Sequence, residues 1–192
     1  MISIANVRTE SPPMDEIQLA RAARSNTEAF AELYRRHVTR VYRYHMAHTG
    51  NIKDAEDLTS QTFLAALEGI RSFRGEGVFA AWLMGIASRK RALFFRGRKP
   101  EVTFDAALHL PAPGLSADQL AGRHLQIESV SRALKGLSPE RAEALILVYF
   151  SGLTNSEAAH VLGKSEAAVK MLISRGLQDL RERTSLALEV EK

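Results

Sequence analysis

Apolar residues recur every three or four positions along nearly all of this chain, and this spacing limits the possible folds more than any other feature. It matches one face of an α-helix, whereas a half-buried strand would alternate strictly between apolar and polar residues. No segment joins β-branched alternation to the turn chemistry of a hairpin. The sequence therefore predicts an all-α protein.

A break in this periodicity divides the chain into two small helical domains. Residues 100–122 contain Pro100, Pro111, Pro113 and Gly114 among few regularly spaced apolar residues, a composition typical of a flexible linker. In chain order, we expect an N-terminal tail (1–14), a first helical domain (15–99), the linker (100–122), a second helical domain (123–185) and a C-terminal tail (186–192).

Capping signals place helices within both domains. In the first domain Ser25 precedes Glu28 by three residues, which is the spacing of a capping box, and the apolar side of the third helix is expected to include Leu64 and Leu67. In the second, Ser138 and Pro139 form a typical helix start. The helices are predicted at about 15–24, 25–48, 52–70, 78–96, 118–135, 139–150, 155–162 and 166–184.

Residues 154–176 predict two capped helices joined by a very short turn. Thr154 and Glu157 have capping-box spacing, Gly163 supplies a turn residue, and Ser165 can cap the second helix. This is the spacing of a helix-turn-helix.

The second of these helices has an apolar side and an opposite polar side. Val169, Ile173 and Leu177 project together at 100° per residue. In a major groove, Arg can reach guanine, Lys and Ser can anchor phosphates, and Met can touch a thymine methyl. An ordinary helical hairpin at a bundle surface also has such a face. The candidate DNA-reading residues are Lys170, Met171, Ser174, Arg175 and Gln178.

The positive charge of the chain is concentrated in its first half. The net charge is +4, and residues 1–100 carry 16 Lys and Arg against 10 Asp and Glu. A basic half suggests a polyanionic partner, although a solvated surface explains it equally well. The densest stretch, 88–99, surrounds Phe94 and Phe95 with cations. Periodicity predicts that Phe94 packs in the core and that Phe95 faces outward, toward DNA or polymerase.

Several classes of function are excluded or disfavoured. The chain has no cysteine, so it has neither disulfides nor a thiolate zinc site. It lacks a signal peptide and the roughly 18 apolar residues of a membrane span, so we expect a cytoplasmic protein without membrane insertion. His45 and His48 have no partner at metal-binding spacing and are expected to pack in the bundle. We expect no enzymatic activity, no cofactor, no metal and no small-molecule substrate.

An ordered set of segments resembles bacterial RNA polymerase sigma factors of the extracytoplasmic-function (ECF) group of the sigma-70 family. The order and spacing hold over roughly residues 15 to 183. The matching segments are A-F-A-E-L-Y-R-R-H (29–37), D-A-E-D-L-T (54–59), S-F-R-G-E-G-V-F-A-A-W-L (72–83), L-S-P-E-R (137–141), G-L-T-N-S-E-A-A (152–159) and A-V-K (168–170).

The resemblance implies two helical domains, called sigma-two and sigma-four, which bind core RNA polymerase and read the minus-10 and minus-35 promoter elements. Such factors help to open the duplex, perform no chemistry of their own, and are commonly held by an anti-sigma factor. The resemblance places polymerase docking on the acidic helix, although the helix dipole also explains acids at a helix start. The implied docking residues are Asp54, Glu56, Asp57, Ser60 and Gln61.

The resemblance also implies a minus-10 and melting surface on the turn at 73–77 and the helix after it. Aromatic stacking and a basic groove suit single-strand capture. Phe79 and Trp82 share a face with Leu83 and Ile86, so core packing is their alternative role. The implied minus-10 residues are Arg74, Phe79, Trp82, Arg89, Arg91, Phe95, Arg96 and Arg98.

Two alternative functions remain. A helix-turn-helix transcriptional regulator that acts without replacing sigma would carry a ligand-binding or receiver domain with strands in its first half, and none is readable. An all-helical adaptor that binds only protein would not need the basic stretch at 89–99.

Overall fold

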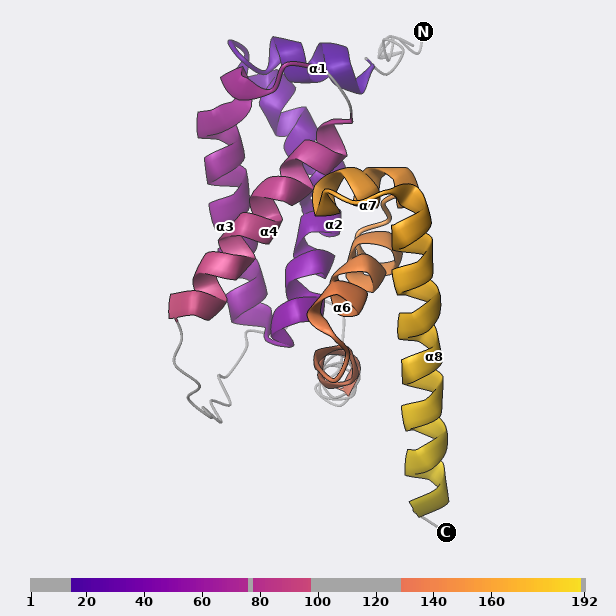
Figure 1. Ribbon diagram of the computed structural model, residues 1–192. Helices are drawn as coiled ribbons and strands as arrows, with labels where there is room; N and C mark the ends of the chain where they lie inside the picture. The colour runs from indigo at the N-terminus through magenta and orange to yellow at the C-terminus, as the bar shows by residue number, and fades with distance from the viewer. Residues whose placement is uncertain (1–14, 76–77, 98–128, 191–192) are drawn as a thin grey trace, which may run out of the picture.

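A computed structural model describes residues 15–75, 78–97 and 129–190, with side chains as far as Arg183, and these ranges contain helices and no strand (Figure 1). The all-α prediction is confirmed. The predicted linker, the predicted N-terminal tail and Arg98 lie outside the described residues. The predicted C-terminal tail begins too early, because the last helix continues to Val190.

The N-terminal bundle packs four α-helices, with α2 against α1, α3 and α4. Asn26 caps α2, because its side-chain oxygen accepts from the backbone N–H of Glu28 at 2.9 Å. The predicted cap at Ser25 is therefore wrong by one residue. Gly50 ends α2 in the left-handed region at φ 69°. The elements are α1 (Glu16–Ala22), α2 (Thr27–Thr49), α3 (Ile52–Gly69), the 3₁₀ turn η1 (Ile70–Ser72) and α4 (Phe79–Gly97).

The C-terminal bundle contains a helical segment at 129–135 and the elements that follow it. Residues 139–150, predicted as one α-helix, change to a π-helix at Ile146, and the N–H of Ser151 donates to the Ile146 carbonyl at 3.0 Å. A π-turn holds one residue more than an α-turn, which neither propensity nor periodicity signals. The elements are α6 (Pro139–Leu145), η2 (Ile146–Phe150), α7 (Asn155–Leu162) and α8 (Glu166–Val190).

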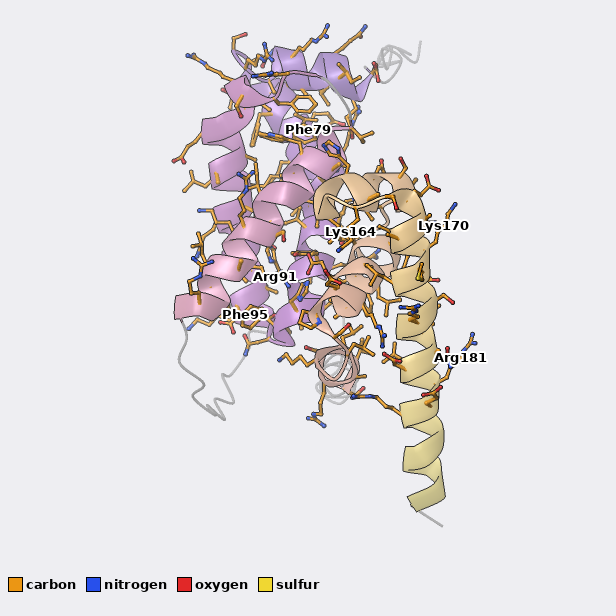
Figure 2. The ribbon with its side chains drawn as sticks, viewed as in Figure 1. Phe79, Arg91, Phe95, Lys164, Lys170 and Arg181 are labelled. Carbon is orange, nitrogen blue, oxygen red and sulfur yellow. The ribbon has the colours of Figure 1, made fainter. Side chains whose placement is uncertain are left out.

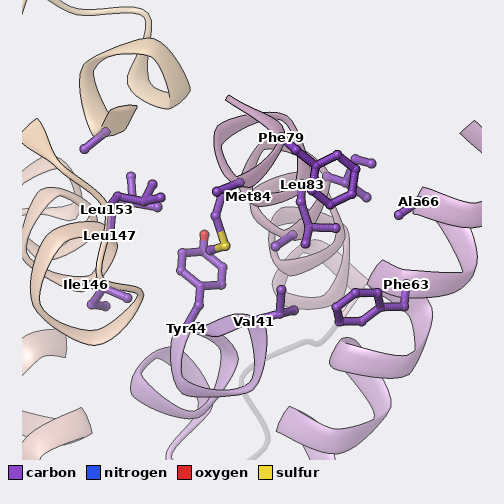
Figure 3. Packing of buried hydrophobic residues seen from close by; sticks show 14 of the residues in the cluster. Val41, Tyr44, Phe63, Ala66, Phe79, Leu83, Met84, Ile146, Leu147 and Leu153 are labelled. Atoms are coloured by element: carbon purple, nitrogen blue, oxygen red, sulfur yellow. The ribbon is translucent and has the colours of Figure 1, made fainter. Parts of the chain in front are cut away.

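The two bundles lie side by side and share one hydrophobic core (Figure 1). Helix α7 lies against α4, and η2 lies against α2. Figure 3 shows Tyr44 and Met84 of the N-terminal bundle facing Ile146, Leu147 and Leu153. Because all five side chains are buried, separating the bundles would expose apolar surface to water.

Candidate nucleic-acid interface

Helices α7 and α8 form the predicted helix-turn-helix. The Thr154 hydroxyl accepts from the Glu157 N–H at 3.2 Å, while the Glu157 carboxylate accepts from the Thr154 N–H at 2.7 Å. Gly163 follows in the left-handed region at φ 62°, and the Ser165 hydroxyl accepts from the Ala168 N–H at 3.2 Å. Both predicted caps and the glycine turn are confirmed.

Helix α8 presents a row of exposed side chains opposite its buried face. Val169 is fully buried and Ile173 is 9% exposed, which anchors the helix to the core. The exposed row contains Lys170, Met171, Ser174, Arg175 and Gln178. Figure 2 shows Lys170 pointing away from the N-terminal bundle. The row is therefore accessible in this arrangement of the two bundles.

Three aromatic rings pack together where η1 meets α4. The rings of Phe73 and Phe79 are 5.5 Å apart at 90°, and those of Phe79 and Trp82 are 5.4 Å apart. Phe79 is 1% exposed and Trp82 is half-buried. The ring of Phe79 therefore belongs to the core and is not presented to a base in this arrangement, because the other rings and His37 surround it.

A pocket of about 320 Å³ lies beside these rings, between the two bundles. Arg74, Trp82 and Arg89 line it from the N-terminal bundle, and His160 and Val161 of α7 line it from the C-terminal bundle. The fold thus brings together three predicted minus-10 residues and places part of the helix-turn-helix against them.

The end of α4 carries exposed cations and one exposed aromatic ring. Arg89 and Arg96 are exposed, and Phe95 is 42% exposed, as predicted. Phe94 is only half-buried and meets Phe95 edge to face at 5.2 Å, so the prediction of a core position is wrong. The buried residues of α4 end at Ala87, and the remaining helix extends past the bundle core.

Arg91 faces the C-terminal bundle and belongs to a cluster of polar side chains around Glu143 of α6. No pattern in the sequence predicted this cluster. The Tyr44 hydroxyl donates to Oε1 of Glu143 at 2.6 Å, while Nη1 of Arg91 and Nε2 of His48 lie 2.8 Å and 3.1 Å from Oε2. Ser88 is 3.5 Å from Oε1. Glu143 is 6% exposed. The sequence feature that could have indicated the cluster is an acid, Glu143, directly before the apolar run A-L-I-L-V.

Burial and charge set the ionisation of this cluster. Burial raises the pKa of the Tyr44 hydroxyl well above its ordinary value, which keeps it a donor. Burial also lowers the pKa of His48. For Glu143, burial acts to raise the pKa, but the hydrogen bond from His48 and the charge of Arg91 outweigh it and leave the pKa below its ordinary value. The cluster therefore holds a carboxylate against a guanidinium.

The outer face of α3 carries the predicted docking residues. Asp54 is half-exposed, and Glu56, Asp57, Ser60 and Gln61 are exposed. The face continues along the helix to Leu64 and Leu67, which are 59% and 44% exposed. The prediction that these leucines face inward is wrong, because Leu58, Thr62, Phe63 and Ala66 supply the buried side.

Neither a metal centre nor a membrane-spanning helix is found in residues 15–75, 78–97 and 129–190. Within them, no group of three or more His, Cys, Asp or Glu side chains could hold a metal ion. No helix in the same ranges has the length and apolar character that crossing a membrane requires.

Both bundles match known protein families. Residues 33–100 match Sigma-70 region 2, and residues 127–180 match Sigma-70, region 4. The ECF RNA polymerase sigma factor BldN of Streptomyces coelicolor is 34% identical over 175 residues, which cover 90% of this chain and 66% of BldN. The chain thus spans just under two thirds of that relative.

Two other relatives are matched over most of their length. The ECF RNA polymerase sigma factor SigM of Bacillus subtilis is 30% identical over 151 residues, 78% of this chain and 91% of SigM. The structure of CnrH in complex with the cytosolic domain of CnrY superposes with a TM-score of 0.71 at 27% identity, over 92% of this chain and 99% of CnrH. With both regions present in the same order, this chain belongs to the ECF sigma factors of the sigma-70 family.

Proposed function

We propose that this chain binds core RNA polymerase in the cytoplasm and directs promoter-specific initiation of transcription, without chemistry of its own. The observation that carries the proposal is the presence of region 2 and region 4 in one chain, together with an accessible polar row on α8. Residues 15–99 read and help to melt the minus-10 element, and residues 123–185 read the minus-35 element.

The minus-35 contacts come from the exposed row on α8. Arg175 reads a guanine edge, Lys170 and Ser174 hold phosphates, and Met171 and Gln178 complete the row. Accessibility of all five side chains supports this assignment.

The minus-10 and melting contacts come from α4 and the turn before it. The exposed cations Arg74, Arg89 and Arg96 hold the backbone, together with Arg91 and Arg98, while Phe95 and the half-buried Trp82 offer rings to unstacked bases. Phe79 supports Trp82 from the core.

Polymerase docks on the outer face of α3. The acids Asp54, Glu56 and Asp57 provide charge, Ser60 and Gln61 provide hydrogen bonds, and the neighbouring exposed leucines add apolar area. We also propose an anti-sigma partner, because the related CnrH was solved bound to CnrY.

Reconstitution with bacterial core polymerase on a random-promoter library tests the proposal. We expect transcripts from promoters that share two short elements, and weak binding of free duplex by the chain alone. Tight binding of an operator by the chain alone, without transcripts, would identify a regulator instead.

A single substitution then tests the minus-35 assignment. Arg175→Ala should lower transcription from a minus-35-dependent promoter by about 5- to 150-fold, the equivalent of one bidentate base contact. Arg132→Ala removes an exposed cation from the helical segment at 129–135 and is the matched control. Equal transcription by the two variants would remove Arg175 from the reading row.

A further inference from the structure

Every polar contact described for the Glu143 side chain crosses from one bundle to the other. Glu143 lies on α6 of the C-terminal bundle, whereas Tyr44 and His48 lie on α2 and Arg91 lies on α4. Within the described residues, its carboxylate has no partner from its own bundle. The buried carboxylate therefore has polar partners only while the bundles are together.

The proton positions follow from the chemistry of the partners. The guanidinium of Arg91 has no acceptor, and its Nη1 lies 3.4 Å from Nδ1 of His48, so Nδ1 must be the accepting nitrogen. The proton of the neutral ring is then on Nε2, which faces Glu143 at 3.1 Å. Tyr44 thus donates to Oε1 of the carboxylate, while Arg91 and His48 lie within ion-pair distance of Oε2.

The contact between the two bundles also covers part of the minus-10 side of α4. Arg91 is engaged by Glu143, and its side chain is 25% exposed. Nearer the start of α4, α7 supplies a wall of the pocket that Trp82 and Arg89 line. The polar row of α8 lies on the opposite side and stays accessible (Figure 2). Closure therefore restricts one DNA-reading surface and leaves the other free.

We propose that Glu143 is an intramolecular latch, which holds the two bundles in a closed, autoinhibited arrangement and withholds Arg91 and the Trp82 face from promoter DNA. The proposal rests on the proposed function, because it takes α4 to be a DNA-reading helix. A buried ion pair contributes little net stability, and in this proposal its role is to select the one arrangement of the bundles that pairs both charges. Opening returns Glu143 to water and frees Arg91.

The fluorescence of Trp82 can report whether the two bundles separate. Trp82 is the single tryptophan, and it lies in the pocket that α7 completes. Its fluorescence emission and its quenching by acrylamide therefore report whether α7 is in place. Small-angle X-ray scattering gives the radius of gyration of the same full-length sample.

Glu143→Gln is the central variant, because glutamine still accepts from Tyr44 but cannot neutralise Arg91. We expect a red shift of Trp82 emission, stronger quenching and a larger radius of gyration, with the helical circular dichroism of the parent chain. Glu140→Gln makes the same charge change on the same helix, where Glu140 pairs with Lys164 at 2.9 Å, and should leave all three readouts unchanged. A Glu143→Gln chain as compact and as weakly quenched as the parent would overturn the latch.

Tyr44→Phe decides the matter if Glu143→Gln fails to fold, because it removes one hydroxyl from the cluster and leaves the ring in the core. It should shift Trp82 in the same direction to a smaller extent, and an unchanged signal would refute the proposal.

Binding of a fluorescein-labelled oligothymidylate tests the withheld surface. Glu143→Gln should bind it several-fold more tightly than the Glu140→Gln control, because Arg91 becomes available to the backbone. An opened chain with unchanged binding would refute the autoinhibitory role. These readouts use the free chain, so they stand even if reconstituted polymerase gives no specific transcripts. If the Glu143→Gln chain stays compact and still directs promoter-specific transcription, the latch is refuted while the proposed function stands.

Discussion

The ammonium group of Lys170 lies 2.6 Å from the carboxylate of Glu166, one turn earlier on α8. Both side chains are well exposed, at 60% and 46%, so the pair contributes less than about 1 kcal/mol to stability. Its consequence is electrostatic, because it places an anion beside a cation proposed to hold a phosphate.

We predict that Glu166→Gln strengthens binding of the reconstituted polymerase to a minus-35-dependent promoter, because it removes the anion that competes for Lys170. The free energy of unfolding should change by less than about 1 kcal/mol, which includes the loss of a favourable charge at the helix start. Fluorescence anisotropy of labelled promoter DNA over a salt series measures the effect. Glu32→Gln, the same charge change at a partly exposed position on α2, is the control. Equal affinities would show that the pair does not limit DNA binding.

Leu64→Ser should weaken holoenzyme formation without destabilising the chain. Leu64 is 59% exposed on the outer face of α3, so burying its remaining surface against polymerase is worth about 1–2 kcal/mol, or 5- to 30-fold in affinity. Titration of labelled chain into core polymerase provides the measurement. Leu93→Ser, at 58% exposure on α4, is the matched control. Equal loss in both variants would argue against docking on α3.

Gly163→Ala should destabilise the helix-turn-helix by about 1–2 kcal/mol, because the turn holds this residue at φ 62°, where a Cβ is unfavourable. Gly85→Ala should act in the opposite sense and raise stability by about 0.5–1 kcal/mol, since it lies inside α4 with open space around its Cβ position. Urea denaturation followed by circular dichroism compares the two. Similar stability changes in both variants would contradict the role of backbone conformation.

Acidification should destabilise the chain through His45. Burial lowers the pKa of His45 to about 3, with smaller lowering contributions from His48 and from the guanidinium of Arg91 and an opposing one from Glu143. Because the unfolded chain takes up a proton near pH 6.5 and the folded chain does not, stability is complete above pH 6.5 and falls by about 1.4 kcal/mol per pH unit below it.

His45→Gln checks this origin of the acid sensitivity. Nε2 of His45 lies 3.0 Å from the Thr62 hydroxyl, which itself donates to the Leu58 carbonyl, so the ring donates and a glutamine amide can replace it. Denaturation between pH 7 and pH 4 should give a flatter profile for the variant than for the parent chain. Parallel pH profiles for the variant and the parent chain would show that other groups cause the acid sensitivity, and Glu143 and His48 would be tested next.

Local signals in the sequence were sufficient for much of the fold. The capping box of Thr154 and Glu157 and the turn at Gly163 depend only on residues three or four positions apart, and each formed as predicted. The polar row of α8 also followed from periodicity. Its buried and exposed faces are opposite each other, so small errors of angle did not matter.

Features that depend on the neighbours of a helix could not be read in the same way. Leu64 and Phe63 are adjacent in the sequence, and only the position of the packing helices decides which one is buried. Glu143 meets Tyr44, ninety-nine residues away, through a contact that no local pattern encodes. A charge inside an apolar run signals that a partner exists, but it does not identify the partner.

The π-turn at η2 also bears on how the length of this segment could change over evolution. A π-turn holds one residue more than an α-turn, so a chain with one residue fewer at Ile146–Phe150 would wind as an α-helix and keep the following elements in nearly the same orientation. A deletion in a neighbouring α-helical turn would instead rotate everything after it by about 100°. The loss of one residue at η2 is therefore the length change that least disturbs the aim of the recognition helix.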